Sequence, residues 1–213
     1  MNLTVHRVLD AAERLFARHG VSAVSLRDIN TAARVSQGVI HYHFKGRDGL
    51  IRALLERHLP DITAERKSMV VNMRQRSCPP TLRELLSVIV VPLARVAIEK
   101  GEAGQRFVRV IGQLHAERNP VFQEVSGQLF SQIGLELLQG LSTHALDISP
   151  EQVELHLGMS MQVTYSALSE IGQASFDWAQ HLNARQLPPW EHVAMLLDFL
   201  CYGFPGSSIA VVE

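Results

Sequence analysis

Residues 25–44 read SLRDINTAARVSQGVIHYHF, and this stretch decides the fold of the chain. Ser25 and Asp28 resemble a capping box, with aspartate in place of the usual glutamate or glutamine, so a helix is expected to begin there. Apolar residues at three- and four-residue spacing give that helix a buried face. After a tight connection at residues 34–35, Ser36 is a suitable N-cap for a third, short helix. Two short helices this close in sequence must cross sharply.

The third helix is poor in apolar side chains for its length. Val39 and Ile40 are expected to face inward, whereas the other positions present amide, imidazole and phenol groups. Basic residues flank the helix, with Arg27 before it and Lys45 and Arg47 after it. Hydrogen-bonding groups between cations fit the major groove of DNA, where base edges present donors and acceptors. We therefore interpret the segment as a helix-turn-helix.

Charge is unevenly distributed along the 213 residues. Residues 1–60 carry nine Lys and Arg against five Asp and Glu, whereas the remainder carries eleven against sixteen. A basic front end on an acidic body indicates that the N-terminal part meets a polyanion. Hydrophobic residues make up 46% of the chain, which is enough to fill the core of one large or two small domains.

Nearly all of the remaining sequence has helical periodicity, and strand patterns are sparse. A long helix is expected to begin near Gly46 and to be kinked or interrupted at Pro60. The other helices are expected at residues 4–19, 82–100 with a bend at Pro92, 105–118, 120–144, 150–172 and 189–203. We predict an all-α protein in which residues 1–48 form a three-helix helix-turn-helix domain. A long helix joins it to a C-terminal helical domain at residues 49–213.

Signals of other protein classes are missing from the sequence. Cys78 and Cys201 are far apart, so we expect neither a disulfide framework nor a zinc site, and a thiol redox switch is the alternative. The motifs HExxH, GxSxG and a phosphate-binding loop are absent, and His41 and His43 have no third metal ligand nearby in sequence. We therefore expect no catalytic residue, metal or cofactor. The alternatives are an enzyme and, ahead of it, a helical adaptor that binds other proteins.

The chain also lacks targeting signals. No apolar run is long enough to cross a membrane. Charges at Arg7, Asp10 and Glu13 interrupt the N-terminal segment before the apolar region of a secretory signal can form. A cytoplasmic protein without a membrane partner is therefore expected.

The segment around residues 8–55, about a quarter of the chain, resembles the DNA-binding domain of TetR-family transcriptional regulators. The resemblance rests on Ala11-Ala12, Leu15-Phe16, Gly20, Ser25 to Ile29, Ala32-Ala33, Val35-Ser36, Gly38, Phe44, Arg47-Asp48 and Leu50. Two positions depart from the family pattern. Arg34 stands where the family often has glycine, which implies a different turn or a left-handed arginine. His41 stands where the family commonly has tyrosine, which puts one DNA contact in question.

The resemblance implies a set of DNA contacts. They are Ser25, Arg27, Ser36, Gln37, Gly38, Val39, His41, Tyr42, His43 and Arg47. Ser25 and Arg27 would meet backbone phosphates at a helix N-terminus. Gln37 would pair with adenine and Val39 would pack on a thymine methyl group. His41, His43 and Arg47 would bind phosphates. As alternatives, Val39 belongs to the core, Tyr42 only supports the third helix, and Arg47 is a solvated surface charge.

The resemblance also implies an effector-binding and dimerisation function for the second half. Aromatic, methionine and polar side chains suggest a pocket for a mainly apolar ligand, although such residues are more often plain core. The pocket candidates are Phe107, Ile111, Leu114, His115, Phe122, Phe130, Met159, Gln162 and Tyr165. Arg106 and Arg109 could neutralise an anionic group, but surface ion pairs are the simpler reading. The dimer candidates are Leu155, Met159, Val163, Val193, Leu196, Leu197 and Leu200.

Together these expectations describe a ligand-responsive regulator of transcription. A homodimer would bind a palindromic double-stranded operator, because one short recognition helix buries too little surface for tight specific binding. A small, mainly apolar effector of unknown identity would release it. Activation in place of repression is the alternative.

Overall fold

In the computed structural model, residues 3–144, 149–171 and 187–203 are described, and within these ranges the chain forms helices and turns without a strand. The prediction of an all-α fold is confirmed. The helices are α1 (Leu3–His19), α2 (Leu26–Ala33), α3 (Gly38–Phe44), α4 (Arg47–Glu56), α5 (Leu59–Arg74), α6 (Leu82–Glu99), α7 (Glu102–Ala116), α8 (Pro120–His144), α9 (Pro150–Ser169) and α10 (Pro189–Tyr202).

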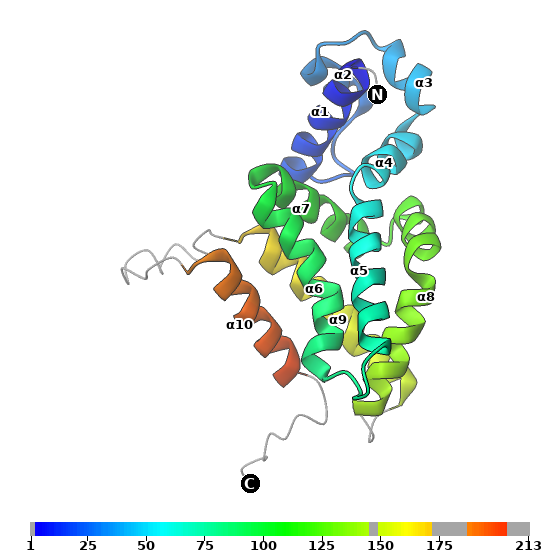
Figure 1. Cartoon of the computed structure of the whole chain (residues 1–213). Coiled ribbons are helices and arrows are strands. Elements are labelled where there is room, and N and C mark those ends of the chain that lie inside the picture. Colours follow the sequence, from blue (N-terminus) through cyan, green and yellow to red (C-terminus); the bar gives the residue numbers. More distant parts are fainter. Residues whose placement is uncertain (1–2, 145–148, 172–186, 204–213) are drawn as a thin grey trace.

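Helices α1–α3 lie at one end of the molecule, and α4 and α5 lead from them into the larger helical body (Figure 1). The capping box at Ser25 is present, since its hydroxyl accepts from the Asp28 amide while the Asp28 carboxylate accepts from the Ser25 amide. The predicted N-cap of the third helix is wrong by one residue. Gln37, not Ser36, occupies that position, and its side chain makes no capping hydrogen bond.

The expected long helix after Gly46 is two helices. The break lies at residues 57–58, and Pro60 sits in the first turn of α5, where a missing N–H costs nothing. The prediction of an interruption near Pro60 is therefore confirmed, with the break placed before the proline. Pro92 lies inside α6, as the sequence indicated.

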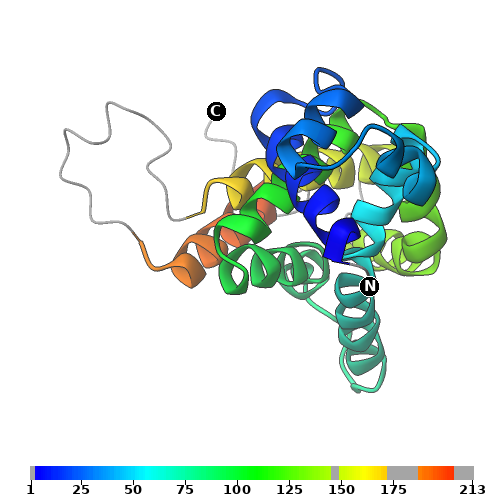
Figure 2. The same cartoon turned by 90° about the horizontal axis from the view of Figure 1, so that it is seen from above.

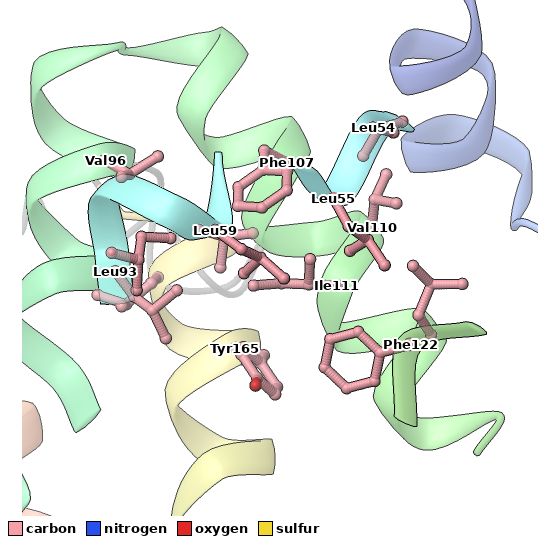
Figure 3. Packing of buried hydrophobic residues seen from close by; sticks show 14 of the residues in the cluster. Leu54, Leu55, Leu59, Leu93, Val96, Phe107, Val110, Ile111, Phe122 and Tyr165 are labelled. Atoms are coloured by element: carbon pink, nitrogen blue, oxygen red, sulfur yellow. The ribbon is translucent and has the colours of Figure 1, made fainter. Parts of the chain in front are cut away.

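The hydrophobic core of the C-terminal half of the chain continues into the N-terminal half. Figure 3 shows Leu55 and Leu59 near Ile111 of α7, and these three side chains are at most 2% exposed. Helix α10 lies on the opposite side of the molecule from α8, as Figures 1 and 2 both show. In the part of the chain that the structure describes, no helix has the length and apolar character needed to cross a membrane.

Candidate DNA-binding surface and effector cavity

One face of α3 is exposed to solvent. Gln37, Gly38, His41, Tyr42 and His43 are exposed, and Tyr42 reaches 75% relative exposure. The opposite face is held down by Ile40 and Phe44, which are buried. Val39 is half-buried against the core, so both of its readings, core and base contact, remain compatible with its place.

The turn between α2 and α3 depends on two arginines. Arg34 adopts the left-handed conformation, with φ 55° and ψ 50°, which is one of the two alternatives that its position implied. Arg7 of α1 donates to the carbonyl oxygens of Ala33 and Arg34 at 2.6 and 3.2 Å. Arg7 therefore supplies donors to the end of α2, where helix carbonyls lack partners. No local sequence signal points to this contact, because the partners lie 26 and 27 residues apart.

Arg47 has a role that differs from the predicted phosphate contact. Its guanidinium donates to the carbonyl oxygen of Val21 at 2.8 Å and also to that of Val24. These carbonyls belong to the connection between α1 and α2, so Arg47 ties the start of α4 to that connection. The half-buried side chain is thus engaged within the chain. We infer that it positions the helix-turn-helix.

Replacing Arg47 with methionine is expected to lower the free energy of unfolding by about 1–3 kcal/mol, because two carbonyls lose a charged donor. Chemical denaturation of the variant measures this loss. Unchanged stability, together with weaker DNA binding and a flatter salt dependence, would restore the phosphate role.

At the start of α2, the two predicted phosphate contacts, Ser25 and Arg27, differ in how available their side chains are. Ser25 is occupied by its own cap, since its hydroxyl donates to the Asp28 carboxylate at 2.6 Å. These hydrogen bonds from Ser25 lower the pKa of Asp28. Arg27 is exposed beside it. The exposed Arg27 guanidinium is therefore the better placed of the two for a phosphate.

A cavity of about 600 Å³ lies between α7, α8 and α9. Its lining consists of His115, Arg118, Phe122, Gln123, Ser126, Gly127, Phe130, Ser131, Glu154, Gly158, Met161 and Tyr165. Four of the nine predicted pocket residues are among them, namely His115, Phe122, Phe130 and Tyr165. We call this space the α7–α9 cavity.

Five predicted pocket residues lie elsewhere. Phe107, Ile111 and Leu114 are at most 1% exposed, belong to the buried core and are not among the residues that line the α7–α9 cavity. Met159 and Gln162 line a neighbouring hollow of about 500 Å³, together with residues at the C-terminal end of α7. The helical spacing of these residues was compatible with either location.

Aromatic rings and neutral polar groups meet at the α7–α9 cavity. The His115 ring contacts the edges of Phe122 and Tyr165, with centroids 6.1 and 5.4 Å apart. Burial lowers the pKa of His115, which favours the neutral imidazole. Burial also raises the pKa of Tyr165 to about 12, so its hydroxyl remains protonated at neutral pH. Figure 3 shows Tyr165 and Phe122 on separate helices at one border of the core.

The cavity adjoins the contacts between the two halves of the chain. Ser22, between α1 and α2, donates to Glu117 at 2.9 Å, and Arg52 of α4 pairs with Glu124 at 2.6 Å. Glu117 precedes the cavity residue Arg118, and Glu124 follows the cavity residue Gln123. A ligand that moves the α7–α8 turn would therefore move the partners of the DNA-binding end.

A buried polar chain joins the same two halves. Glu13 of α1 lies 3.3 Å from Nε2 of His58, and Lys100 donates to Nδ1 of His58 at 3.2 Å. Glu13 and His58 are nearly inaccessible, and the His58 ring stacks on Phe107 at 4.1 Å. Buried polar groups that satisfy one another fix a unique packing. These contacts link α1 to the junction of α4 and α5 and, through the His58 ring, to Phe107 of α7.

The predicted dimer surface is only partly exposed. Val193, Leu196, Leu197 and Leu200 are at most 6% exposed and pack in the chain's own core. Val163 is half-buried, whereas Leu155 and Met159 are 63% and 48% exposed. The apolar residues that α10 exposes are Trp190, Met195, Phe199 and Tyr202, none of which was among the predicted dimer candidates.

Cysteines and metal-binding groups add no site to this picture. Cys78 and Cys201 are both free thiols. Within residues 3–144, 149–171 and 187–203, no group of three or more His, Cys, Asp or Glu is placed to hold a metal ion.

Two family models match the chain. One, described as bacterial regulatory proteins of the tetR family, matches residues 8–54. The other, described as a tetracyclin repressor-like C-terminal domain, matches residues 87–203. Together they cover the helix-turn-helix and most of the helical body.

Curated relatives match the N-terminal part. The HTH-type transcriptional regulator AcrR of Shigella flexneri is 43% identical over 53 residues, which is 25% of this chain and 25% of that protein. The HTH-type transcriptional repressor KstR2 of Rhodococcus jostii is 31% identical over 65 residues, 30% of this chain and 32% of that protein. In these alignments the chain spans about a quarter to a third of the length of the relatives that it matches.

Solved structures match almost the whole chain. A probable transcriptional regulatory protein, RHA5900, has a TM-score of 0.60 at 18% identity and covers 96% of this chain and 98% of its own. The ketosteroid transcriptional regulator KstR2 of Mycobacterium tuberculosis has a TM-score of 0.57 at 20% identity and covers 93% and 95%. At such identities the likeness concerns the fold alone.

Proposed function

This chain belongs to the TetR family of transcriptional regulators, and on that premise we propose that it is a ligand-released repressor that binds a palindromic operator as a homodimer. It is thus a regulator of transcription and no enzyme. We assign operator reading to residues 1–48, and effector binding and dimerisation to residues 49–213. The observation that carries the proposal is the exposed polar face of α3 on a firmly held helix-turn-helix.

The proposed base contacts are made by the first residues of α3 and by Tyr42. Gln37 makes no capping bond and is exposed, so its amide is available to an adenine edge. Gly38 has no atom within 4 Å of where a Cβ would stand, so the space above its backbone is open to the DNA. The proposed phosphate contacts are Arg27, Ser36, His41 and His43, with Lys45 added as an exposed cation at the end of α3.

The proposed homodimer forms through the outer faces of α9 and α10. Leu155 and Met159 on α9, and Met195 and Phe199 on α10, expose large apolar side chains. Exposed apolar residues gathered on neighbouring helices mark an association surface. Two copies joined there would present two α3 helices to two half-sites, which supplies the interface that one helix lacks.

The proposed effector site is the α7–α9 cavity. Its lining of aromatic rings with a few polar groups suits a mainly apolar ligand. Contacts beside it, Ser22 with Glu117 and Arg52 with Glu124, connect its walls to the helix-turn-helix. A ligand releases the operator to the extent that it binds more tightly to the dimer whose α3 helices are wrongly spaced.

A gel-shift titration of the purified full-length protein with DNA from beside its own gene tests the proposal. We expect a complex of one dimer on a palindrome that is competed by specific DNA and weakened by salt. Absence of any sequence-specific, salt-sensitive complex with that DNA would favour the alternative of a helical adaptor.

A further inference from the structure

Arg66, in the middle of α5, is a buried cation without an acidic partner among the described residues. It is 6% exposed, and its Nε and Nη2 atoms donate to the carbonyl oxygens of Val88 and Ile89, both at 3.1 Å. The adjacent carboxylate of Glu65 is paired with Arg95 at 3.0 Å. Burying a charge that no opposite charge offsets is costly, so the guanidinium requires an explanation.

The proline in α6 explains the hydrogen bonds of Arg66. Pro92 has no N–H, so the carbonyl of Val88, four residues earlier, loses its helical donor. Arg66 replaces that donor. A neutral amide side chain could do the same without burying a charge. The proline therefore accounts for a donor at this position and leaves the positive charge unexplained.

The charge of Arg66 lies directly behind the wall of the α7–α9 cavity. Its Cζ atom is 4.6 Å from the centroid of the Phe130 ring, and Phe130 lines the cavity. The same charge acts electrostatically on Tyr165, which lines the cavity from α9. Among the described residues, none is hydrogen-bonded to the Tyr165 hydroxyl, which leaves this protonated group as a donor.

The other charged groups that line the cavity do not cancel the positive charge of Arg66. Arg118 and Glu154 both line it, and their formal charges sum to zero. His115 contributes a neutral ring. The lining thus combines apolar rings with one uncompensated positive charge behind them.

We propose that the α7–α9 cavity takes a monoanionic amphiphile, an apolar body carrying a carboxylate or similar group that lies near Tyr165 and Phe130 and is attracted by Arg66. The inference rests on the proposed effector role of this cavity. It adds the sign of the ligand's charge and assigns the selection for that charge to Arg66.

A matched pair of fluorescent probes tests the sign. Both carry the N-phenyl-1-naphthylamine skeleton, and 1-anilinonaphthalene-8-sulfonate alone carries an anionic group. We expect the wild-type protein to bind the sulfonate about tenfold more tightly than the neutral amine, as one charge nearby in a partly polar interior would give. Equal affinities, or tighter binding of the neutral amine, would overturn the proposal.

A pair of variants separates the charge of Arg66 from its structural role. In Pro92→Ala the helix regains its own N–H donor, so Arg66 is no longer needed for the Val88 carbonyl. Arg66→Met on that background then removes the charge without leaving this carbonyl unpaired. We expect Pro92→Ala to keep the preference for the sulfonate, and the double variant to lose it. A preference that survives in the folded double variant would contradict the assignment to Arg66.

A third variant reports where the probes bind. Gly158 lines the cavity and a Cβ there would meet nothing within 4 Å, so the side chain of Gly158→Phe begins in open space at the cavity wall. We expect it to abolish binding of both probes. If both still bind, the cavity is not the site, and the proposed effector role fails together with this inference. If both are blocked but bind the wild type equally, the cavity stands and only its charge preference is overturned.

Discussion

Gly49→Ala is expected to abolish specific operator binding in an otherwise helical protein. A Cβ on Gly49 of α4 would lie 1.7 Å from the carbonyl oxygen of Phe44, the last residue of α3. Because that atom belongs to the backbone, α3 must move away from α4. Specific affinity should fall more than about a hundredfold, since two or more base contacts of about 1–3 kcal/mol each lose their register. The free energy of unfolding should fall by about 1–3 kcal/mol. Anisotropy titration with operator DNA and chemical denaturation measure the two effects.

Gly134→Ala is the matched control for this prediction. Gly134 lies within α8, and a Cβ there would meet nothing within 4 Å. The substitution should stabilise the helix by about 0.5–1 kcal/mol and leave operator affinity unchanged. Equal operator affinity of Gly49→Ala and Gly134→Ala would show that the crossing of α3 and α4 does not position a DNA-reading surface.

The double substitution Met195→Glu and Phe199→Glu is expected to convert the protein into a monomer. Both side chains lie one turn apart on α10 and are 59% and 62% exposed, so charges there should not disturb the chain's own core. Two copies would bring four carboxylates into one apolar interface, which is strongly unfavourable. With one half-site per molecule, operator affinity should fall about a thousandfold, towards non-specific binding. Light scattering after gel filtration gives the mass, and anisotropy gives the affinity.

Leu135→Glu controls for the general effect of a surface charge. Leu135 is 61% exposed on α8, on the side of the molecule away from α10. The Leu135→Glu variant should remain dimeric and bind the operator as the wild type does. A double variant that is still dimeric would place the interface somewhere other than the outer face of α10.

Local features of the fold followed from local sequence. Capping boxes are present at Ser25, Thr81 and Ser149, and each joins residues only three positions apart. The left-handed conformation of Arg34 was one of two readings of an arginine where glycine is usual. Signals of this kind involve only residues within about one helical turn of each other, so they can be recognised in the sequence.

Contacts between distant segments were not predictable in the same way. Arg7 and Arg47 carry no local sign of their partners, and each proved to bind backbone carbonyls more than 20 residues away. Helix α10 is apolar on more than one face, so periodicity could not decide which face packs on α6 and which is exposed. The sequence therefore suggested Leu196 and Leu197 for the interface, where the structure exposes Met195 and Phe199. For the cavity, Phe107 and Phe122 have equally plausible spacing, and only tertiary packing separates core from lining.

The most direct test of the DNA-reading surface is the operator preference of Gln37→Ala. The Gln37 side chain is exposed and makes no capping hydrogen bond, so the free energy of unfolding should stay within about 0.5 kcal/mol of the wild type. Affinity for the wild-type operator should fall by about 1–3 kcal/mol, with discrimination lost at one base pair of each half-site. Anisotropy titrations against the operator and its single-base variants measure both quantities. Unchanged affinity and unchanged preference would contradict the assignment of α3 as the recognition helix.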